Sequence, residues 1–243
     1  MIKAVFDAGL TNVFYYAFHV LGVLSVIFFN LWYGPKYGIA KKKALLITLF
    51  AYPLVYVWIY IEYWIESGFR DFGGNNIVRG FIYMPLIAWP FFKWMKVKFL
   101  RGSDFIAPCV CLTMFVSHIG CIFPGCCNGY ECPSFGIYNI GTQTYVFPVQ
   151  LFEAVTALLV VLIVVFRAKK KHFMSDGRSY PLMLMLYGST RFLWEFARDN
   201  EKIWHGISVL AFHAAFMTIV GAVWMIILVC RSKKQVNTIT SRL

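Results

Sequence analysis

The sequence predicts an all-α membrane protein with about seven transmembrane helices, and three observations support this prediction. Hydrophobic residues make up 60% of the 243 residues and charged residues only 14%, which is more apolar surface than a soluble domain can bury. Apolar stretches of about 20 residues recur, and a helix of that length crosses a hydrocarbon layer about 30 Å thick. Lipid offers the backbone no hydrogen-bond partners, so we expect each stretch to be helical.

The predicted spans follow one another along the whole chain. They cover approximately residues 12–33, 43–62, 77–97, 104–123, 148–166, 179–197 and 207–229. Neither an internal repeat nor a low-complexity linker divides them, so we expect a single transmembrane domain over residues 1–243. The first span has no small-residue cleavage site after it and is expected to be a retained helix. A loop at about 125–147 is rich in Gly, Cys, Tyr and Asn and has no Lys or Arg.

Basic residues alternate between the two sides of the predicted bundle. Clusters of Lys and Arg follow the first, third, fifth and seventh spans, whereas each of the other connections holds at most two such residues. The positive-inside rule therefore predicts an N-terminus outside the cytoplasm and a cytoplasmic C-terminus. The net charge of +12 is explained by this topology signal, so we expect no nucleic-acid partner.

Polar and ionisable side chains from five spans fall at one depth, in the outer half of the predicted bundle. These are Tyr16 and His19, Arg79, His118, Gln150 and Glu153, and Arg191 and Glu195. Ionisable groups within spans cost a few kcal/mol each on insertion scales, so they usually face a bundle interior or a wet cavity. Separate interfacial anchors or interhelical hydrogen bonds are the structural alternative.

The sixth span carries the sharpest pattern. Tyr187, Arg191, Glu195 and Arg198 are spaced four, four and three residues apart, which places them on one face of a helix. In the structural interpretation Arg191 and Glu195 form a salt bridge. In the functional interpretation Arg191 binds an anion, because a guanidinium grips phosphate oxygens with two parallel hydrogen bonds, and Glu195 orients it.

Four of the seven cysteines, Cys121, Cys126, Cys127 and Cys132, lie at or beyond the outer end of the fourth span. A location outside the cytoplasm permits disulfides, and at least one is expected among the four, although the spacing leaves the pairing open. A metal site is a weaker alternative because no C-x-x-C pair occurs, so we predict no metal. A catalytic thiol is weaker still.

Four segments occur in a characteristic order over about residues 73–200. They are Asp104-Phe105-Ile106-Ala107-Pro108; Gly120-Cys121 with Gly125-Cys126-Cys127-Asn128-Gly129; Pro148-Val149-Gln150-Leu151-Phe152-Glu153-Ala154; and Tyr187-Gly188-Ser189-Thr190-Arg191-Phe192-Leu193-Trp194-Glu195-Phe196. Together they resemble the bacterial prolipoprotein diacylglyceryl transferase family, in its cysteine-containing branch. The resemblance implies a multi-pass protein of the bacterial cytoplasmic membrane.

The chain departs from the family pattern at two positions. Where the family usually has an arginine ahead of the glycine that corresponds to Gly120, this chain has His118. Where the family often has a His-Gly-Gly run, this chain has Val78-Arg79-Gly80. We hypothesise that Arg79 and His118 supply the same two chemical types with their positions exchanged.

The resemblance implies an activity that needs no cofactor: transfer of a diacylglyceryl group from phosphatidylglycerol to the thiol of a lipobox cysteine in a prolipoprotein signal peptide, among membrane lipids. A leaving phosphate needs fixed positive charge, which Arg191 and Arg79 would supply. His118 is the first candidate for the base that takes the thiol proton, and His19 is the second. The remaining roles fall to substrate-binding or positioning residues, which are Tyr16, Tyr187, Asn128, Glu153 and Glu195.

Two other classes of function remain open at this point. A transporter or channel would carry polar groups through both membrane halves, whereas the inner half of these spans is almost wholly apolar. A noncatalytic or altered-acceptor relative that binds lipid or a membrane partner is also compatible with the two departures.

Overall fold

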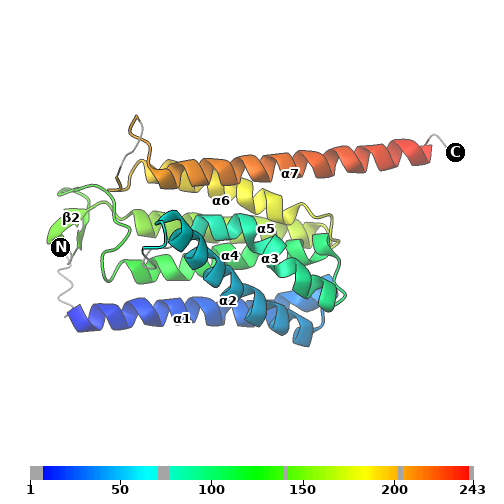
Figure 1. Ribbon diagram of the computed structural model, residues 1–243, viewed down its shortest axis with the longest axis horizontal. Helices are drawn as coiled ribbons and strands as arrows, with labels where there is room; N and C mark the ends of the chain where they lie inside the picture. The colour runs from blue at the N-terminus through cyan, green and yellow to red at the C-terminus, as the bar shows by residue number, and fades with distance from the viewer. Residues whose placement is uncertain (1–7, 71–76, 140–141, 202–204, 241–243) are drawn as a thin grey trace.

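The computed structural model describes residues 8–70, 77–139, 142–201 and 205–240, and within these ranges it contains seven α-helices (Figure 1). The helices are α1 (Ala8–Tyr33), α2 (Lys41–Glu66), α3 (Ile77–Trp94), α4 (Phe99–Cys121), α5 (Val149–Lys170), α6 (Ser179–Glu195) and α7 (Val209–Thr240). A short 3₁₀ helix, η1 (Gly34–Tyr37), joins α1 to α2, and two strands, β1 (Ile137–Asn139) and β2 (Thr144–Val146), form an antiparallel hairpin. The all-α prediction is confirmed.

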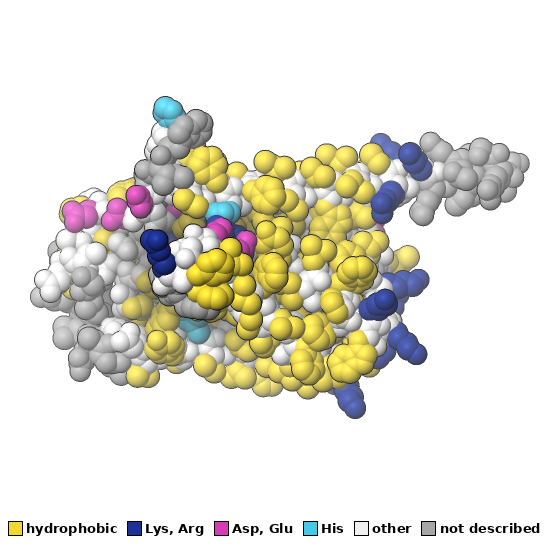
Figure 2. Space-filling model, in the orientation of Figure 1, with side chains coloured by type: hydrophobic (Ala, Val, Ile, Leu, Met, Phe, Trp, Pro, Cys, Tyr) yellow, Lys and Arg dark blue, Asp and Glu magenta, His cyan; other side chains and the backbone are white. Residues whose placement is uncertain are grey.

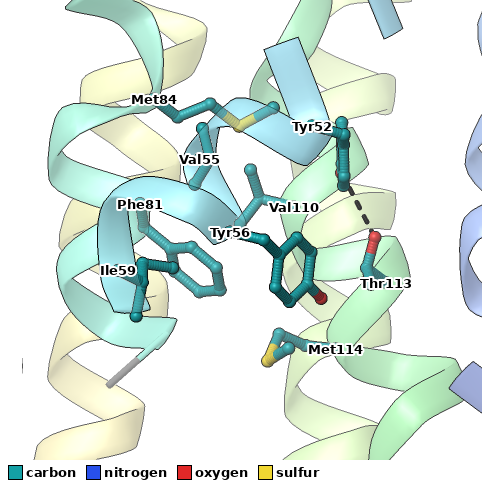
Figure 3. A pocket seen from close by; sticks show the side chains of 9 residues that line it. All are labelled: Tyr52, Val55, Tyr56, Ile59, Phe81, Met84, Val110, Thr113 and Met114. Atoms are coloured by element: carbon teal, nitrogen blue, oxygen red, sulfur yellow. Dashed lines mark hydrogen bonds between the residues drawn. The ribbon is translucent and has the colours of Figure 1, made fainter. Parts of the chain in front are cut away.

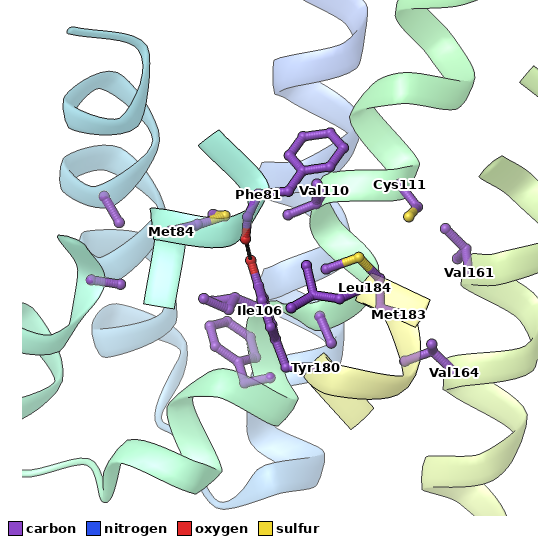
Figure 4. Packing of buried hydrophobic residues seen from close by; sticks show 14 of the residues in the cluster. Phe81, Met84, Ile106, Val110, Cys111, Val161, Val164, Tyr180, Met183 and Leu184 are labelled. Atoms are coloured by element: carbon purple, nitrogen blue, oxygen red, sulfur yellow. Dashed lines mark hydrogen bonds between the residues drawn. The ribbon is translucent and has the colours of Figure 1, made fainter. Parts of the chain in front are cut away.

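Helix α4 is the central helix of the bundle, where it packs against α1, α3, α5 and α6. Its buried side chains meet those of the neighbouring helices in one apolar core, part of which Figure 4 shows. The Tyr180 hydroxyl on α6 donates a 2.6 Å hydrogen bond to the Phe81 carbonyl on α3, so this buried hydroxyl group has a hydrogen-bond partner. This packing fixes α4, α5 and α6 relative to one another, and these helices carry the site described below.

The outer surface of the bundle is apolar along its waist. Large hydrophobic side chains such as Phe28, Trp58, Leu162 and Ile226 are exposed there, while Lys and Arg side chains gather at one end of the face shown in Figure 2. In the described part of the chain, five helices are long and apolar enough to cross a membrane, namely α1, α2, α4, α5 and α7. The chain is therefore a multi-pass membrane protein, and the full count of seven spans remains a prediction.

Topology can be tested with reporters at two positions. The loop charges predict that a reporter fused after Leu243 is cytoplasmic and that one inserted near Gly141 is extracytoplasmic. Protease protection or a compartment-specific reporter enzyme measures both locations. If both reporters lie on the same side, a span must be removed from the predicted topology.

The loop between α4 and α5 folds over the end of the bundle that lies opposite the basic residues. The hairpin was not predicted, because strands of three residues leave almost no periodic signal in a sequence. Gly129 brings the loop against the segment after α6: its N–H bonds the Phe147 carbonyl at 3.0 Å, and an added Cβ would lie 2.6 Å from the Ala197 carbonyl oxygen. The Tyr130 N–H bonds that Ala197 carbonyl at 3.2 Å, so the loop caps the region around Arg198.

Candidate functional site

A buried carboxylate, Glu153 on α5, lies at the centre of a cluster of charged side chains. Three cationic side chains contact it: His118 Nε2 lies 2.8 Å from Oε2, Arg191 Nη1 lies 3.0 Å from Oε1, and Arg198 Nη2 contacts Oε2. Only 1% of Glu153 is exposed. Side chains from α4, from α6 and from the turn after α6 therefore converge on one side chain of α5.

A second carboxylate, Glu195 at the end of α6, completes the cluster. It pairs with Arg191 one turn earlier on the same helix, and the Arg198 Nε lies 3.9 Å from its Oε2. Its Oε1 accepts a hydrogen bond from the Ser208 hydroxyl at 2.8 Å and another from the Asn200 amide. These neutral donors fix Glu195 and so fix the position of Arg191.

His118 connects α4 to the carboxylate at the centre of the cluster. Its Nδ1 lies 2.9 Å from the Met114 carbonyl oxygen, and its Nε2 lies 2.8 Å from Oε2 of Glu153. These two contacts hold the imidazole ring in place between its own helix and α5. The assignment of His118 as the base stays a prediction.

The cluster combines two guanidinium groups and an imidazole with two carboxylates. Arg191, Arg198 and His118 face Glu153 and Glu195, and all five side chains are buried. Buried charges are costly unless they are paired, and each carboxylate contacts both guanidinium groups. Guanidinium groups that are fixed in this way are suited to bind a negatively charged group.

A cavity of about 310 Å³ opens beside the cluster. Its lining is formed by Tyr15, Tyr16, His19, Tyr56, Tyr60, Met114, Ser117, His118, Cys121, Cys126 and Cys127. His118 belongs both to this lining and to the charged cluster, so the cluster borders the cavity directly. The hydroxyl, imidazole and thiol groups around it can donate or accept hydrogen bonds.

A smaller apolar pocket adjoins this cavity between α2, α3 and α4 (Figure 3). Tyr56 and Met114 line both spaces, and the remaining lining is apolar except for Thr113, which bonds the Tyr52 hydroxyl at 3.2 Å. A ligand with a charged end in the cavity and an apolar portion toward this pocket would find matching surfaces in both.

Arg79 does not join the cluster around Glu153. It pairs with Glu66 and with Glu62 on α2, the latter at 3.6 Å, and its Nε donates a 3.0 Å hydrogen bond to His213 Nε2 on α7. The hypothesis that Arg79 and His118 exchange positions within one site is therefore not supported, because these two residues contact different acidic groups. Arg79 instead ties α3 to α2 and α7.

The other predicted site residues have mixed placements. Tyr16 lines the cavity but is 66% exposed, whereas Tyr187 is buried and its ring lies 5.4 Å from the ring of Phe81. Asn128 is half-buried in the loop, and its carbonyl accepts a 3.3 Å hydrogen bond from the Asp199 N–H beside Arg198. Gln150 holds the loop through a 2.7 Å bond to the Cys126 carbonyl.

Three members of the cluster were missing from the predicted site. Arg198 belonged to the stripe on the sixth span, and its spacing from Glu195 could have included it. Ser208 and Asn200 could not have been found this way, because they follow α6 in a connection whose path the sequence does not reveal.

All seven cysteines lie in the described residues, and all are free thiols in this structure. The expected disulfide is not formed. The sulfurs of Cys121, Cys126 and Cys127 nevertheless lie within 4.8 Å of one another, so three of the four cysteines lie close together.

The sequence model of the family described as "Prolipoprotein diacylglyceryl transferase" matches residues 3–227. The chain belongs to this family. The match covers every residue of the charged cluster and of the cavity lining, so the site is part of the family domain.

Individual relatives share modest identity with the chain. A "Phosphatidylglycerol--prolipoprotein diacylglyceryl transferase" of Idiomarina loihiensis is 29% identical over 184 residues, covering 74% of this chain and 66% of the relative. One of Streptococcus suis is 24% identical over 226 residues, covering 86% and 85%. A third, "transferase 2" of Clostridium perfringens, is 24% identical over 143 residues, or 55% of this chain, and the alignment spans only 54% of that relative.

Proposed function

We propose that the chain transfers a diacylglyceryl group from phosphatidylglycerol to the lipobox cysteine thiol of a prolipoprotein, in the bacterial cytoplasmic membrane. The observation that carries this proposal is the pair of buried guanidinium groups, Arg191 and Arg198, in a cluster that borders a cavity through His118. The names of the relatives specify phosphatidylglycerol and a prolipoprotein for those proteins. The phosphate of an anionic phospholipid is a suitable partner for guanidinium groups.

During the proposed reaction, negative charge develops on the phosphate of the donor, which guanidinium groups can bind. The acceptor sulfur forms a bond to the glycerol carbon of the donor, and the C–O bond to the phosphate breaks. The electron pair of that bond leaves with glycerol phosphate, so the phosphate gains negative charge in the transition state. Fixed cations that are already in position, here Arg191 and Arg198, stabilise this charge without reorganisation.

The thiol proton requires a base, and we assign this role to His19. The Nε2 of His118 already contacts Glu153 at 2.8 Å. His19 lines the same cavity and contacts the Tyr15 carbonyl oxygen through Nδ1 at 2.9 Å, so its Nε2 is the atom that would accept the thiol proton.

A direct assay tests the proposed activity. Purified protein in vesicles that contain phosphatidylglycerol should add a diacylglyceryl mass to a lipobox peptide, and vesicles of phosphatidylethanolamine alone should not support the reaction. Binding of phosphatidylglycerol without any transfer would identify a noncatalytic relative and refute the proposal.

The different contacts of the two histidines predict different effects of substitution. His118→Gln and His118→Arg both keep an N–H donor toward Glu153, so each should lose much less of the transfer rate than a variant that lacks the base. His19→Gln should lower the rate by about 10²- to 10⁴-fold, with partial rescue by added imidazole.

Transfer rates of the three variants, with His172→Gln as an exposed control, separate the two histidine roles. Equal losses in His118→Gln and His118→Arg, together with a normal rate in His19→Gln, would return the base role to His118.

A further inference from the structure

Three thiols that the proposed reaction does not use converge at the outer end of α4. The sulfurs of Cys121, Cys126 and Cys127 lie within 4.8 Å of one another, and a cation at their centre would be within bonding range of all three after small side-chain rotations. Soft thiolate sulfur selects Zn²⁺ and Cu⁺ over the harder divalent cations. We propose that Cys121, Cys126 and Cys127 form a binding site for a thiophilic d¹⁰ cation, Zn²⁺ or Cu⁺.

The loop geometry explains why the spacing in the sequence did not predict this site. The chain turns back on itself just after α4, with Gly125 at φ +70° and Cys127 at φ +61°. The left-handed region is costly for a residue other than glycine, and at Cys127 it brings two adjacent cysteines close to Cys121. The turn thereby does what the C-x-x-C spacing does in other metal sites.

Two buried amide side chains hold this turn in place. The Asn139 amide donates a 2.9 Å hydrogen bond to the Gly125 carbonyl, and the Gln150 amide donates a 2.7 Å hydrogen bond to the Cys126 carbonyl. Both amides are nearly fully buried. The thiols are therefore positioned by the protein before any ion binds, which reduces the ordering cost of binding.

A positive charge lies beside the three cysteines. Three thiolates around Zn²⁺ carry a net charge of −1 and around Cu⁺ a charge of −2, and the Arg198 guanidinium beside Cys127 offsets part of that charge. Binding of the ion releases the thiol protons.

The three cysteines also offer an entry path and an open coordination position. Cys121 is buried, Cys126 is half-buried and Cys127 is exposed, so an ion can reach the site from the loop side. All three line the cavity described above, whose water would supply a fourth ligand to Zn²⁺. The ion would link the end of α4 to the loop and so stabilise both.

Metal content measured on the full chain tests the site without any transfer assay. Protein in lipid nanodiscs is reduced with a phosphine under anaerobic conditions, incubated with Zn²⁺ or with a Cu⁺ complex, desalted, and analysed for metal per chain. We expect one ion per chain in wild type and in Cys132→Ser, because Cys132 lies outside the cluster. Cys127→Ser and Cys126→Ser should retain almost none.

Two further measurements guard against misfolding and adventitious binding. Cys127 is exposed, so Cys127→Ser should match wild type in melting temperature without metal and lack the rise that metal gives wild type. Co²⁺ as a probe should give a thiolate-to-metal charge-transfer band in wild type that Cys127→Ser lacks. If reduced wild type binds no metal, or no more than Cys127→Ser, the site does not exist and the cluster is a set of thiols or a disulfide pair.

Discussion

Glu153→Gln should produce the largest loss of stability among single substitutions in the charged cluster. The carboxylate is the shared partner of His118, Arg191 and Arg198, and a neutral amide would leave two buried guanidinium groups facing Glu195 alone. Removing one partner from a buried ion pair typically costs about 3–5 kcal/mol. We expect a clear fall in the melting temperature of the detergent-solubilised protein.

Glu131→Gln provides the matched control, because Glu131 is an exposed carboxylate in the adjacent loop. Its melting temperature should stay within error of wild type, since exposed charges contribute little. A Glu153→Gln protein as stable as this control would mean that water or lipid headgroups already neutralise the cations. Glu153 would then not be the centre of the cluster.

Arg191→Lys should lower the rate of diacylglyceryl transfer by about 10²- to 10³-fold, which corresponds to about 3–4 kcal/mol of lost transition-state stabilisation. The lysine ammonium keeps the charge but replaces a planar fork with a single point, so it cannot hold two carboxylates and a phosphate together. The variant should still insert and fold, because its charge balance is unchanged. Transfer rate and melting temperature are measured on the same preparation.

Arg79→Lys is the control for this experiment, since Arg79 is also a buried arginine with two glutamate partners but lies outside the cluster. It should lose stability without a comparable loss of transfer rate. The opposite pattern, with near-normal transfer by Arg191→Lys and a lowered melting temperature, would make the stripe on α6 structural. The phosphate would then be held elsewhere, with Arg79 the next residue to test.

The helices were predictable because lipid forces apolar stretches of sufficient length into one backbone conformation. Each of the first six predicted spans ends within about four residues of the end of the observed helix. Helix α7 extends beyond the seventh predicted span, because it continues past Arg231 into a polar segment that hydropathy does not mark. The stripe on α6 was also correct as a pattern, since Arg191, Glu195 and Arg198 do face one another.

The partners across helices could not be predicted in the same way. Depth along a span places Arg79 and His118 at one level, but the rotation of each helix decides which neighbour a side chain meets. The apolar packing of α3 and α4 turns Arg79 toward α2 and α7 and turns His118 toward Glu153.

The length of helix α7 has a further consequence for the depth of the site in the membrane. Val209 and Arg231 are 22 residue steps apart, which at about 1.5 Å per step is roughly 33 Å, close to the thickness of the hydrocarbon layer. Arg231 is exposed and resists entry into lipid, so we expect its end of the helix to lie at one headgroup layer. Ser208, which immediately precedes α7, is then expected at the opposite headgroup layer, together with the Glu195 carboxylate to which it donates a hydrogen bond. The length of one apolar helix thereby predicts that the charged cluster lies at the level of the phospholipid phosphates.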